Sequence, residues 1–106
     1  MKTAELTGAA LDWAVQQCEG ARKDIDFVWW TDDHYSPSTD WAQGGPIIER
    51  ECIDLQYQGG EEDVWAADVF DADNMLFGNT PLIAAMRGYV ASKFGDTVDI
   101  PEELMP

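Results

Sequence analysis

The chain has 106 residues, 45% of them hydrophobic, which fits one globular domain and leaves no room for two. Its 21 acidic residues against six lysines and arginines give a net charge of −15, which disfavours direct binding to nucleic-acid phosphates and to anionic membranes. No segment reaches the ~18 apolar residues of a membrane span, and the first residues lack the apolar core of a signal peptide, so we expect a cytoplasmic protein.

Residues 7–20 are predicted to form the first helix. Thr7 can cap its N-terminus, and Gly20 suits a left-handed stop. Cys18 belongs to the apolar face and is expected in the core, not as a nucleophile. Cys18 and Cys52 form no metal spacing and no disulfide framework, so we expect two free thiols. The residues that repeat at helical spacing are Ala10, Leu11, Ala14, Val15 and Cys18.

A buried strand is predicted at residues 26–31, which are apolar and rich in β-forming side chains. An irregular stretch is expected from residue 32 to residue 46, because it holds Pro37, Gly44, Gly45 and Pro46 among several turn-forming polar residues. A structureless stretch of this length is uncommon in a small domain, and such stretches are often functional.

A hairpin is expected to follow. Its first strand is predicted at residues 47–56 and its second at residues 63–70, with Gly59 and Gly60 as the turn. Alternation along the second strand places Trp65 and Val69 on the core side.

A second helix is predicted, with Thr80 as its N-cap and Gly95 at its end. Pro81 is its first helical residue, where the missing N–H costs nothing. A short strand is predicted at residues 97–100. The sequence therefore predicts an α+β fold, a small single domain over residues 1–106 with two helices packed on a short antiparallel sheet. The second helix carries one apolar stripe, formed by Leu82, Ile83, Met86, Tyr89, Val90 and Phe94.

The sequence offers little for catalysis. His34 follows Asp32 and Asp33, but no neighbouring Ser or Cys has a recognisable nucleophile setting. A run of acids fails the calcium-loop pattern because Met75 stands where an oxygen ligand is needed. No phosphate-loop pattern is present. We therefore expect no enzymatic activity, no metal and no cofactor, and we interpret the run as a solvated acidic face: Glu61, Glu62, Asp63, Asp68, Asp71 and Asp73.

The segment from Tyr35 to Gly45 has the composition of a ligand pocket, since it combines aromatic rings, hydroxyls and exposed backbone. Arg50 and Arg87 could add positive charge, with Arg87 at the edge of the apolar stripe. The alternative is a turn-rich loop pinned by Trp41, with both arginines paired to surface acids. The candidate ligand-binding residues are Tyr35, Ser36, Ser38, Thr39, Asp40, Trp41, Gly44, Gly45, Arg50 and Arg87.

Three stretches carry a resemblance to a known family: MKTAELTGAALDWAV at residues 1–15, YSPSTDWAQGGPIIERE at residues 35–51 and TPLIAAMRGYVASKFG at residues 80–95. They cover about half of the chain and resemble the phage NinX family. The resemblance implies a protein of tailed phages and prophages, acting in the cytoplasm of a bacterial host, and it points to no particular activity. The family pattern often has glycine after Glu-Arg-Glu, where this chain has Cys52, so the turn there is expected to be altered.

Three functions are compatible with the sequence. The first is a non-enzymatic phage accessory protein that binds a host protein or a small nucleotide-like ligand, as counter-defence proteins that sequester nucleotide signals do; Trp41 or Tyr35 would stack on the base and the arginines would grip phosphate. The second is an acidic inhibitor or DNA mimic that uses the face from Glu61 to Asp73. The third, a small enzyme, has the least support. A homo-oligomer is compatible with so small a domain.

Overall fold

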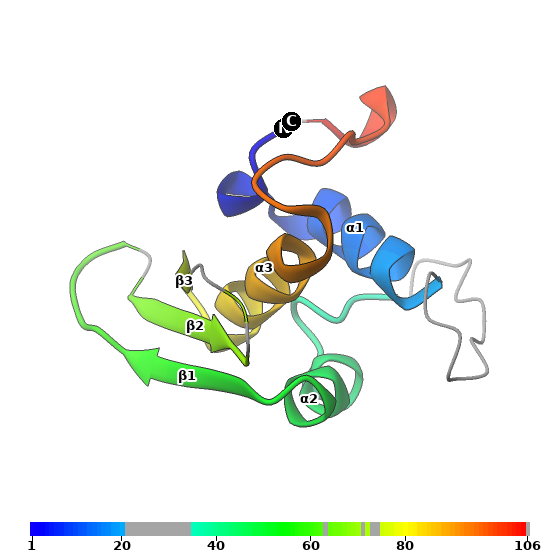
Figure 1. Ribbon diagram of the computed structural model, residues 1–106. Coiled ribbons are helices and arrows are strands. Elements are labelled where there is room, and N and C mark those ends of the chain that lie inside the picture. The colour runs from blue at the N-terminus through cyan, green and yellow to red at the C-terminus, as the bar shows by residue number, and fades with distance from the viewer. Residues whose placement is uncertain (21–34, 63, 71, 73–74, 106) are drawn as a thin grey trace.

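Two layers make up the fold, a three-stranded antiparallel sheet and a set of helices on one side of it (Figure 1). The computed structural model describes residues 1–20, 35–62, 64–70, 72 and 75–105. The predicted strand at residues 26–31 and His34 lie outside these ranges. In chain order the elements are η1 (Thr3–Glu5), α1 (Gly8–Gly20), α2 (Trp41–Arg50), β1 (Ile53–Tyr57), β2 (Trp65–Val69), β3 (Met75–Gly78), α3 (Pro81–Phe94) and η2 (Glu102–Leu104).

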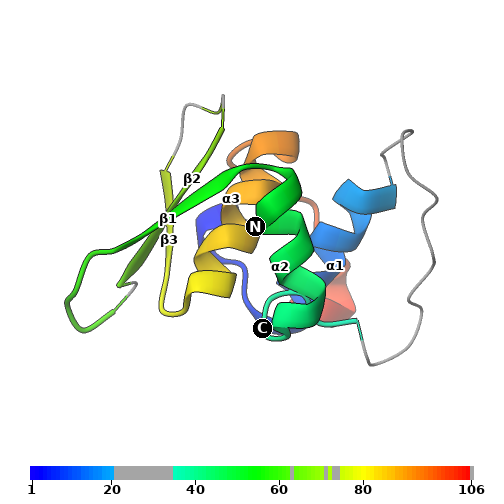
Figure 2. The same cartoon turned by 90° about the horizontal axis from the view of Figure 1, so that it is seen from below.

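The helix α3 is the centre of the molecule. Its N-terminus is capped as predicted, because the Thr80 hydroxyl accepts the Ile83 N–H at 3.1 Å, and Gly95 ends it with φ of 83°. The predicted single apolar stripe is too narrow. Figure 2 shows α3 between the sheet and the other two helices, and most of its circumference is buried. Its buried residues are Leu82, Ala84, Ala85, Met86, Arg87, Gly88, Tyr89 and Val90.

The sheet has the order β1-β2-β3. The predicted hairpin is confirmed: β1 pairs with β2, and Gly59 and Gly60 have positive φ in the connection, which is longer than two residues. Ala67 and Val69 face α3, where a Cβ on Gly88 would stand 3.1 Å from Val69 Cγ2. The placement of Trp65 and Val69 on the core side is therefore confirmed, since residues two apart share a face. The strand β3 was not predicted.

Two predictions are wrong in the region of the helix α2. Residues 41–50 are helical, so the irregular stretch ends before Trp41, and the strand predicted at residues 47–56 is confined to Ile53–Tyr57. The Asp40 carboxylate caps the helix by accepting the Ala42 N–H at 3.0 Å. Gly44 is needed inside the helix, because a Cβ there would strike the Pro37 carbonyl oxygen and lie 2.6 Å from Leu82 Cδ2. Tertiary packing thus overrides the loop signal of Gly44, Gly45 and Pro46.

The segment after α3 also differs from the prediction. Residues 97–100 form no full strand; a single antiparallel bridge joins Thr97 to Lys2. The Met1 ammonium donates to the Val98 carbonyl at 3.0 Å, and the Val98 N–H donates to the Met1 carbonyl at 2.9 Å. The first residues are therefore held against the segment after α3. Of the described helices, none has the length and apolar character of a membrane span.

Candidate functional site

Only the second half of the predicted pocket loop, residues 41–45, is helical, because α2 begins at Trp41. The Ser36 N–H donates to the Gln43 side-chain oxygen at 2.8 Å, and the Gln43 amide nitrogen donates to the Asp40 carboxylate at 2.9 Å. Thr39 closes the turn through its N–H, which donates to the Ser36 carbonyl at 3.1 Å. Polar groups expected to face a ligand are thus engaged within their own segment.

Ser38 joins this segment to α1. It is buried, and its N–H donates to the Asp12 carboxylate at 2.9 Å. Burial raises the pKa of Asp12, and the interactions with the Ser38 side chain and backbone oppose that increase. Trp41, by contrast, is 54% exposed at the first turn of α2, and Gly45 lies beside its ring. The Tyr35–Gly45 candidates therefore divide between buried and outward positions.

Arg50 ties three helices together. Its guanidinium donates two bonds to Glu19 of α1, at 2.6 and 3.1 Å, and one to Glu51 at 2.8 Å. It also bonds the Tyr89 hydroxyl of α3 at 3.1 Å, while that hydroxyl donates to Glu19 at 2.6 Å. These charge-assisted bonds raise the pKa of Arg50 against the opposing effect of burial. The arginine is therefore paired with acids, as the alternative interpretation of the sequence expected.

Tyr35 and Cys18 lie close to this cluster. Burial raises the pKa of Tyr35, and Glu19 raises it further. Burial likewise raises the pKa of Cys18 to about 12, so its thiol stays protonated and unreactive at neutral pH. Cys18 belongs to the hydrophobic core, which confirms its predicted place there. Of the candidate residues, Tyr35 and Arg50 are thus brought to the same part of the fold.

Arg87 has a different position from the one predicted. It lies within the buried surface of α3, not at the edge of the apolar stripe, and its exposed fraction is 6%. Its guanidinium donates to the Leu6 carbonyl at 2.8 Å and to the Phe77 carbonyl at 2.7 Å. It therefore links η1 and β3 through α3, while Arg50 links α1, α2 and α3. The two arginines serve different packing contacts and do not form one anion-binding pair.

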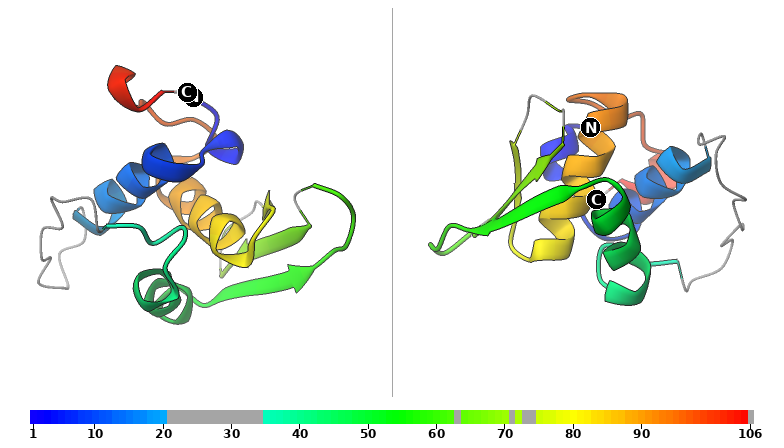
Figure 3. Two further views of the ribbon diagram at one scale, coloured as in Figure 1. Left: turned by 180° about the vertical axis from the view of Figure 1, so that it is seen from behind. Right: turned by 60° about the horizontal axis from the view of Figure 1, so that its bottom comes forward.

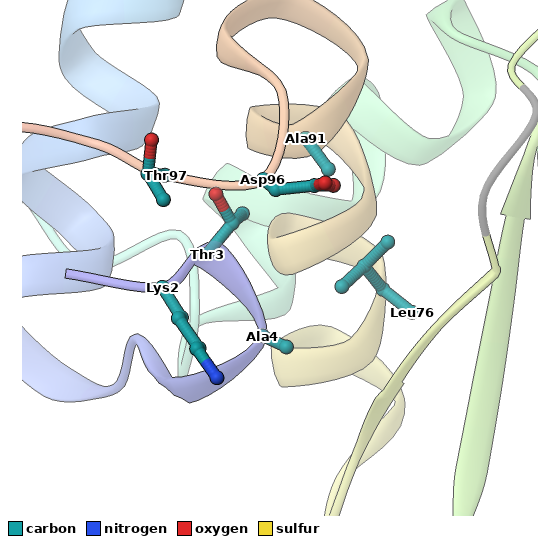
Figure 4. A pocket seen from close by; sticks show the side chains of 7 residues that line it. All are labelled: Lys2, Thr3, Ala4, Leu76, Ala91, Asp96 and Thr97. Atoms are coloured by element: carbon teal, nitrogen blue, oxygen red, sulfur yellow. The ribbon is translucent and has the colours of Figure 1, made fainter.

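A cavity lies where the sequence gave no signal. Its volume is about 330 Å³, and it opens between the N-terminal segment, β3 and the end of α3. The side chains of Leu76 and Ala91 form an apolar wall beside the Asp96 carboxylate, with Lys2 at the rim (Figure 4). Lys2 and Thr97 are paired and both line this space, and a contact between residues so far apart in the chain leaves no local pattern. The lining is Lys2, Thr3, Ala4, Leu76, Ala91, Asp96 and Thr97.

The side of the sheet that faces away from α3 is the strongest candidate for a binding surface. We call it the outward sheet face, and α1, α2 and α3 all lie on the opposite side (Figures 2 and 3). Met75 and Phe77 are each 43% exposed there, although they are large and apolar. Ala66 lies between Gln56 and Phe77 in the register and is buried. The outward sheet face comprises Asp54, Gln56, Ala66, Asp68, Met75 and Phe77.

Two carboxylates give this face a negative charge. Asp54 is directly opposite Asp68 in the register, and both are exposed. Like charges at such positions destabilise a strand pair. The cationic side chains that the structure describes lie elsewhere: Arg87 is buried in α3, Arg50 and Lys93 stand beside Glu51, and Lys2 lines the cavity of Figure 4.

The predicted acidic face is only partly placed by the structure. Glu61 and Glu62 are exposed in the connection between β1 and β2, and Asp68 is exposed on the outward sheet face. Asp63, Asp71 and Asp73 lie outside the described residues. Asp54 was missed because it joins Asp68 only through the register of the sheet, although an acid alternating with Ile53 and Leu55 is a recognisable sign of an outward position.

Comparison with known proteins assigns the chain to a family. Among curated proteins, none matches its sequence. A family model described as "Bacteriophage P22, NinX" matches residues 2–93, which span α1, α2, the sheet and nearly all of α3. The match covers well over half of the 106 residues and agrees with the resemblance found in residues 1–15, 35–51 and 80–95. The chain therefore belongs to the phage NinX family.

Proposed function

We propose that this phage protein is a non-enzymatic accessory protein that binds a basic host protein through the outward sheet face. The observation that carries the proposal is the combination of exposed Met75 and Phe77 with the facing carboxylates of Asp54 and Asp68. Apolar side chains supply buried area at an interface, and complementary charge supplies specificity and a fast approach. The partner surface would carry lysines or arginines around an apolar centre.

Charge favours this partner over two others. A nucleic acid would bring phosphates to a protein of net charge −15, and a second copy would bring Asp54 and Asp68 against their own equivalents. A basic protein gains from both the local carboxylates and the net charge of the molecule. Such a protein would be met in the host cytoplasm, where this chain would act as an acidic inhibitor or as a mimic of DNA.

Sequestration of a nucleotide signal by the residues around Trp41 is less well supported. Arg50 is engaged by Glu19 and Glu51, and Arg87 is buried among backbone carbonyls. A phosphate would have to displace a carboxylate from Arg50 within an acidic protein, which is electrostatically unfavourable. Trp41 remains the residue there that could stack on a base.

The proposal is tested with a synthetic amphipathic peptide that carries lysines on one helical face and leucines on the other. We expect its addition to shift the backbone NMR signals of β1, β2 and β3 on the outward sheet face. The double variant Asp54→Lys/Asp68→Lys should weaken binding by about tenfold or more, because attraction becomes repulsion. Binding by the unaltered protein should weaken as salt is added.

A matched control changes the net charge equally at another place. Glu102→Lys/Glu103→Lys alters two exposed acids of η2, away from the sheet. The control should bind the peptide nearly as the unaltered protein does. If both double variants lose affinity to the same extent, net charge and not the outward sheet face governs binding, and the proposal is wrong. The two double variants should also be compared for binding to any host protein that the unaltered protein captures from infected cells.

A further inference from the structure

A second cavity, on the helical side of the molecule, combines aromatic and hydrogen-bonding groups. Its volume is about 330 Å³. Trp13 and Gln17 are four residues apart on α1 and therefore share one helical face, and Phe94 ends α3. The segment after α3 completes the lining. We call this space the Trp13 cavity, and its lining residues are Trp13, Gln17, Phe94, Thr97, Val98 and Asp99.

Two walls of the Trp13 cavity are held in place. Trp13 packs against the hydrophobic core on one side. Val98 is fixed through both its N–H and its carbonyl, which bond the carbonyl and the ammonium of Met1. Trp13 and the backbone of Val98 are therefore placed before a ligand binds, which lowers the ordering cost of binding. Phe94 is the outermost wall and is 44% exposed.

The polar groups of this cavity are available to a ligand. Among the hydrogen bonds and ion pairs of the described residues, none involves the side chain of Gln17 or Asp99. A glutamine amide both donates and accepts, and a carboxylate accepts from N–H groups. Two aromatic rings with these two groups match a flat ring that carries ring nitrogens and an amino group.

We propose that the Trp13 cavity binds an uncharged nitrogen heterocycle of the nucleobase class, as a free base or a nucleoside. Trp13 and Phe94 stack on the ring, Gln17 pairs with its edge, and Asp99 accepts from an exocyclic amino group. The volume is at the small end of ligand pockets, about 300–1,000 Å³. Asp99 and the net charge of −15 repel phosphate, so a nucleoside is preferred over its phosphorylated forms.

The test is titration of the ¹⁵N-labelled protein with adenine, adenosine and adenosine triphosphate. The indole signal of Trp13, identified with Trp13→Phe, should shift with adenine and adenosine. The triphosphate should bind at least tenfold more weakly than adenosine. Phe94→Ala should weaken adenosine binding by about fivefold or more, because one stacking surface is lost. Asp99→Asn should also weaken adenosine binding while reducing the discrimination against the triphosphate.

Phe77→Ala is the matched control, since Phe77 has nearly the same exposed fraction, 43%, on the outward sheet face. It should leave adenosine binding unchanged. The proposal is overturned if millimolar adenine and adenosine leave the Trp13 indole signal in place, or if Phe77→Ala and Phe94→Ala weaken binding equally. Either result would leave the peptide experiment on the outward sheet face unaffected, because the two surfaces and their probes are different.

Discussion

Cys52 has a backbone conformation that favours glycine. Its φ is 54°, the left-handed region, and among the described non-glycine residues it is the one with positive φ. The resemblance to the NinX family implies glycine at this position, where the chain has cysteine. The turn keeps the conformation that glycine would adopt, and β1 still begins at the next residue, Ile53. The expected alteration of the turn is therefore strain at Cys52 and not a change of path.

Replacing Cys52 with glycine should stabilise the protein. Cys52→Gly relieves the contact between Cβ and the backbone and should raise the free energy of unfolding by about 1 kcal/mol. Cys52→Ala is the control, because it removes the exposed thiol and keeps Cβ. Urea denaturation measures both. Equal stabilisation by alanine and glycine would show that the thiol, and not the backbone, is responsible.

Arg87 should prove to be a stability residue. Arg87→Ala leaves the Leu6 and Phe77 carbonyls without their charged donor and should cost about 3 kcal/mol or more in unfolding free energy. Arg87→Lys should recover part of the loss, since an ammonium cannot reproduce both guanidinium bonds. Lys93→Ala, on the same helix and 45% exposed, should cost less than about 1 kcal/mol. A loss for Arg87→Ala no larger than for Lys93→Ala, in urea denaturation, would contradict this role.

At the scale of elements, two adjacent glycines of α2 should respond in opposite ways. Gly44→Ala forces a methyl group against Pro37 and Leu82 and should destabilise the protein by about 1–3 kcal/mol. Gly45→Ala meets open space, with the Trp41 ring at 4.0 Å, and should stabilise the helix by about 0.5–1 kcal/mol. Thermal unfolding of the two variants decides the matter. Destabilisation by both substitutions would mean that the contact of residue 44 with Pro37 and Leu82 does not distinguish the two glycines.

The helices α3 and α2 show what the local sequence can and cannot predict. The helix α3 was predicted with its bounds because Thr80, Pro81 and Gly95 mark its ends within a few residues. The helix α2 was missed because its glycines and proline resemble a loop, and the reason for Gly44 lies in Pro37 and Leu82. One local signal was present: Asp40 followed three residues later by Gln43 is a helix-start pattern.

At the scale of the whole molecule, the fold class could be predicted and the candidate surfaces could not. Periodicity and turns are local and gave the α+β class. The outward sheet face depends on the register that sets Asp54 beside Asp68, and the Trp13 cavity depends on a segment held by Met1. The predicted pair of Arg50 and Arg87 was not formed because each found a closer partner in packing. These are contacts between distant parts of the chain.

The net charge of −15 should make stability depend on salt. Screening reduces repulsion among exposed acids, so added sodium chloride should raise the melting temperature. Each 1 kcal/mol of repulsion removed corresponds to about 4–8 °C for a domain of roughly this size. Calorimetry over a series of salt concentrations measures the effect, with potassium chloride as the control for ion-specific binding. A melting temperature that falls with salt would mean that attractive pairs, such as Arg50 with Glu19, outweigh the repulsion.

The central position of α3 has a consequence for how the chain assembles. β2 and β3 directly precede α3 and pack on it, so these three elements can form a nucleus through contacts near in sequence. α1 comes from the far end of the chain and must close a long loop before it gains its contacts with α3. We therefore expect early folding around β2, β3 and α3, and late docking of α1, so that core mutations in α1 chiefly accelerate unfolding.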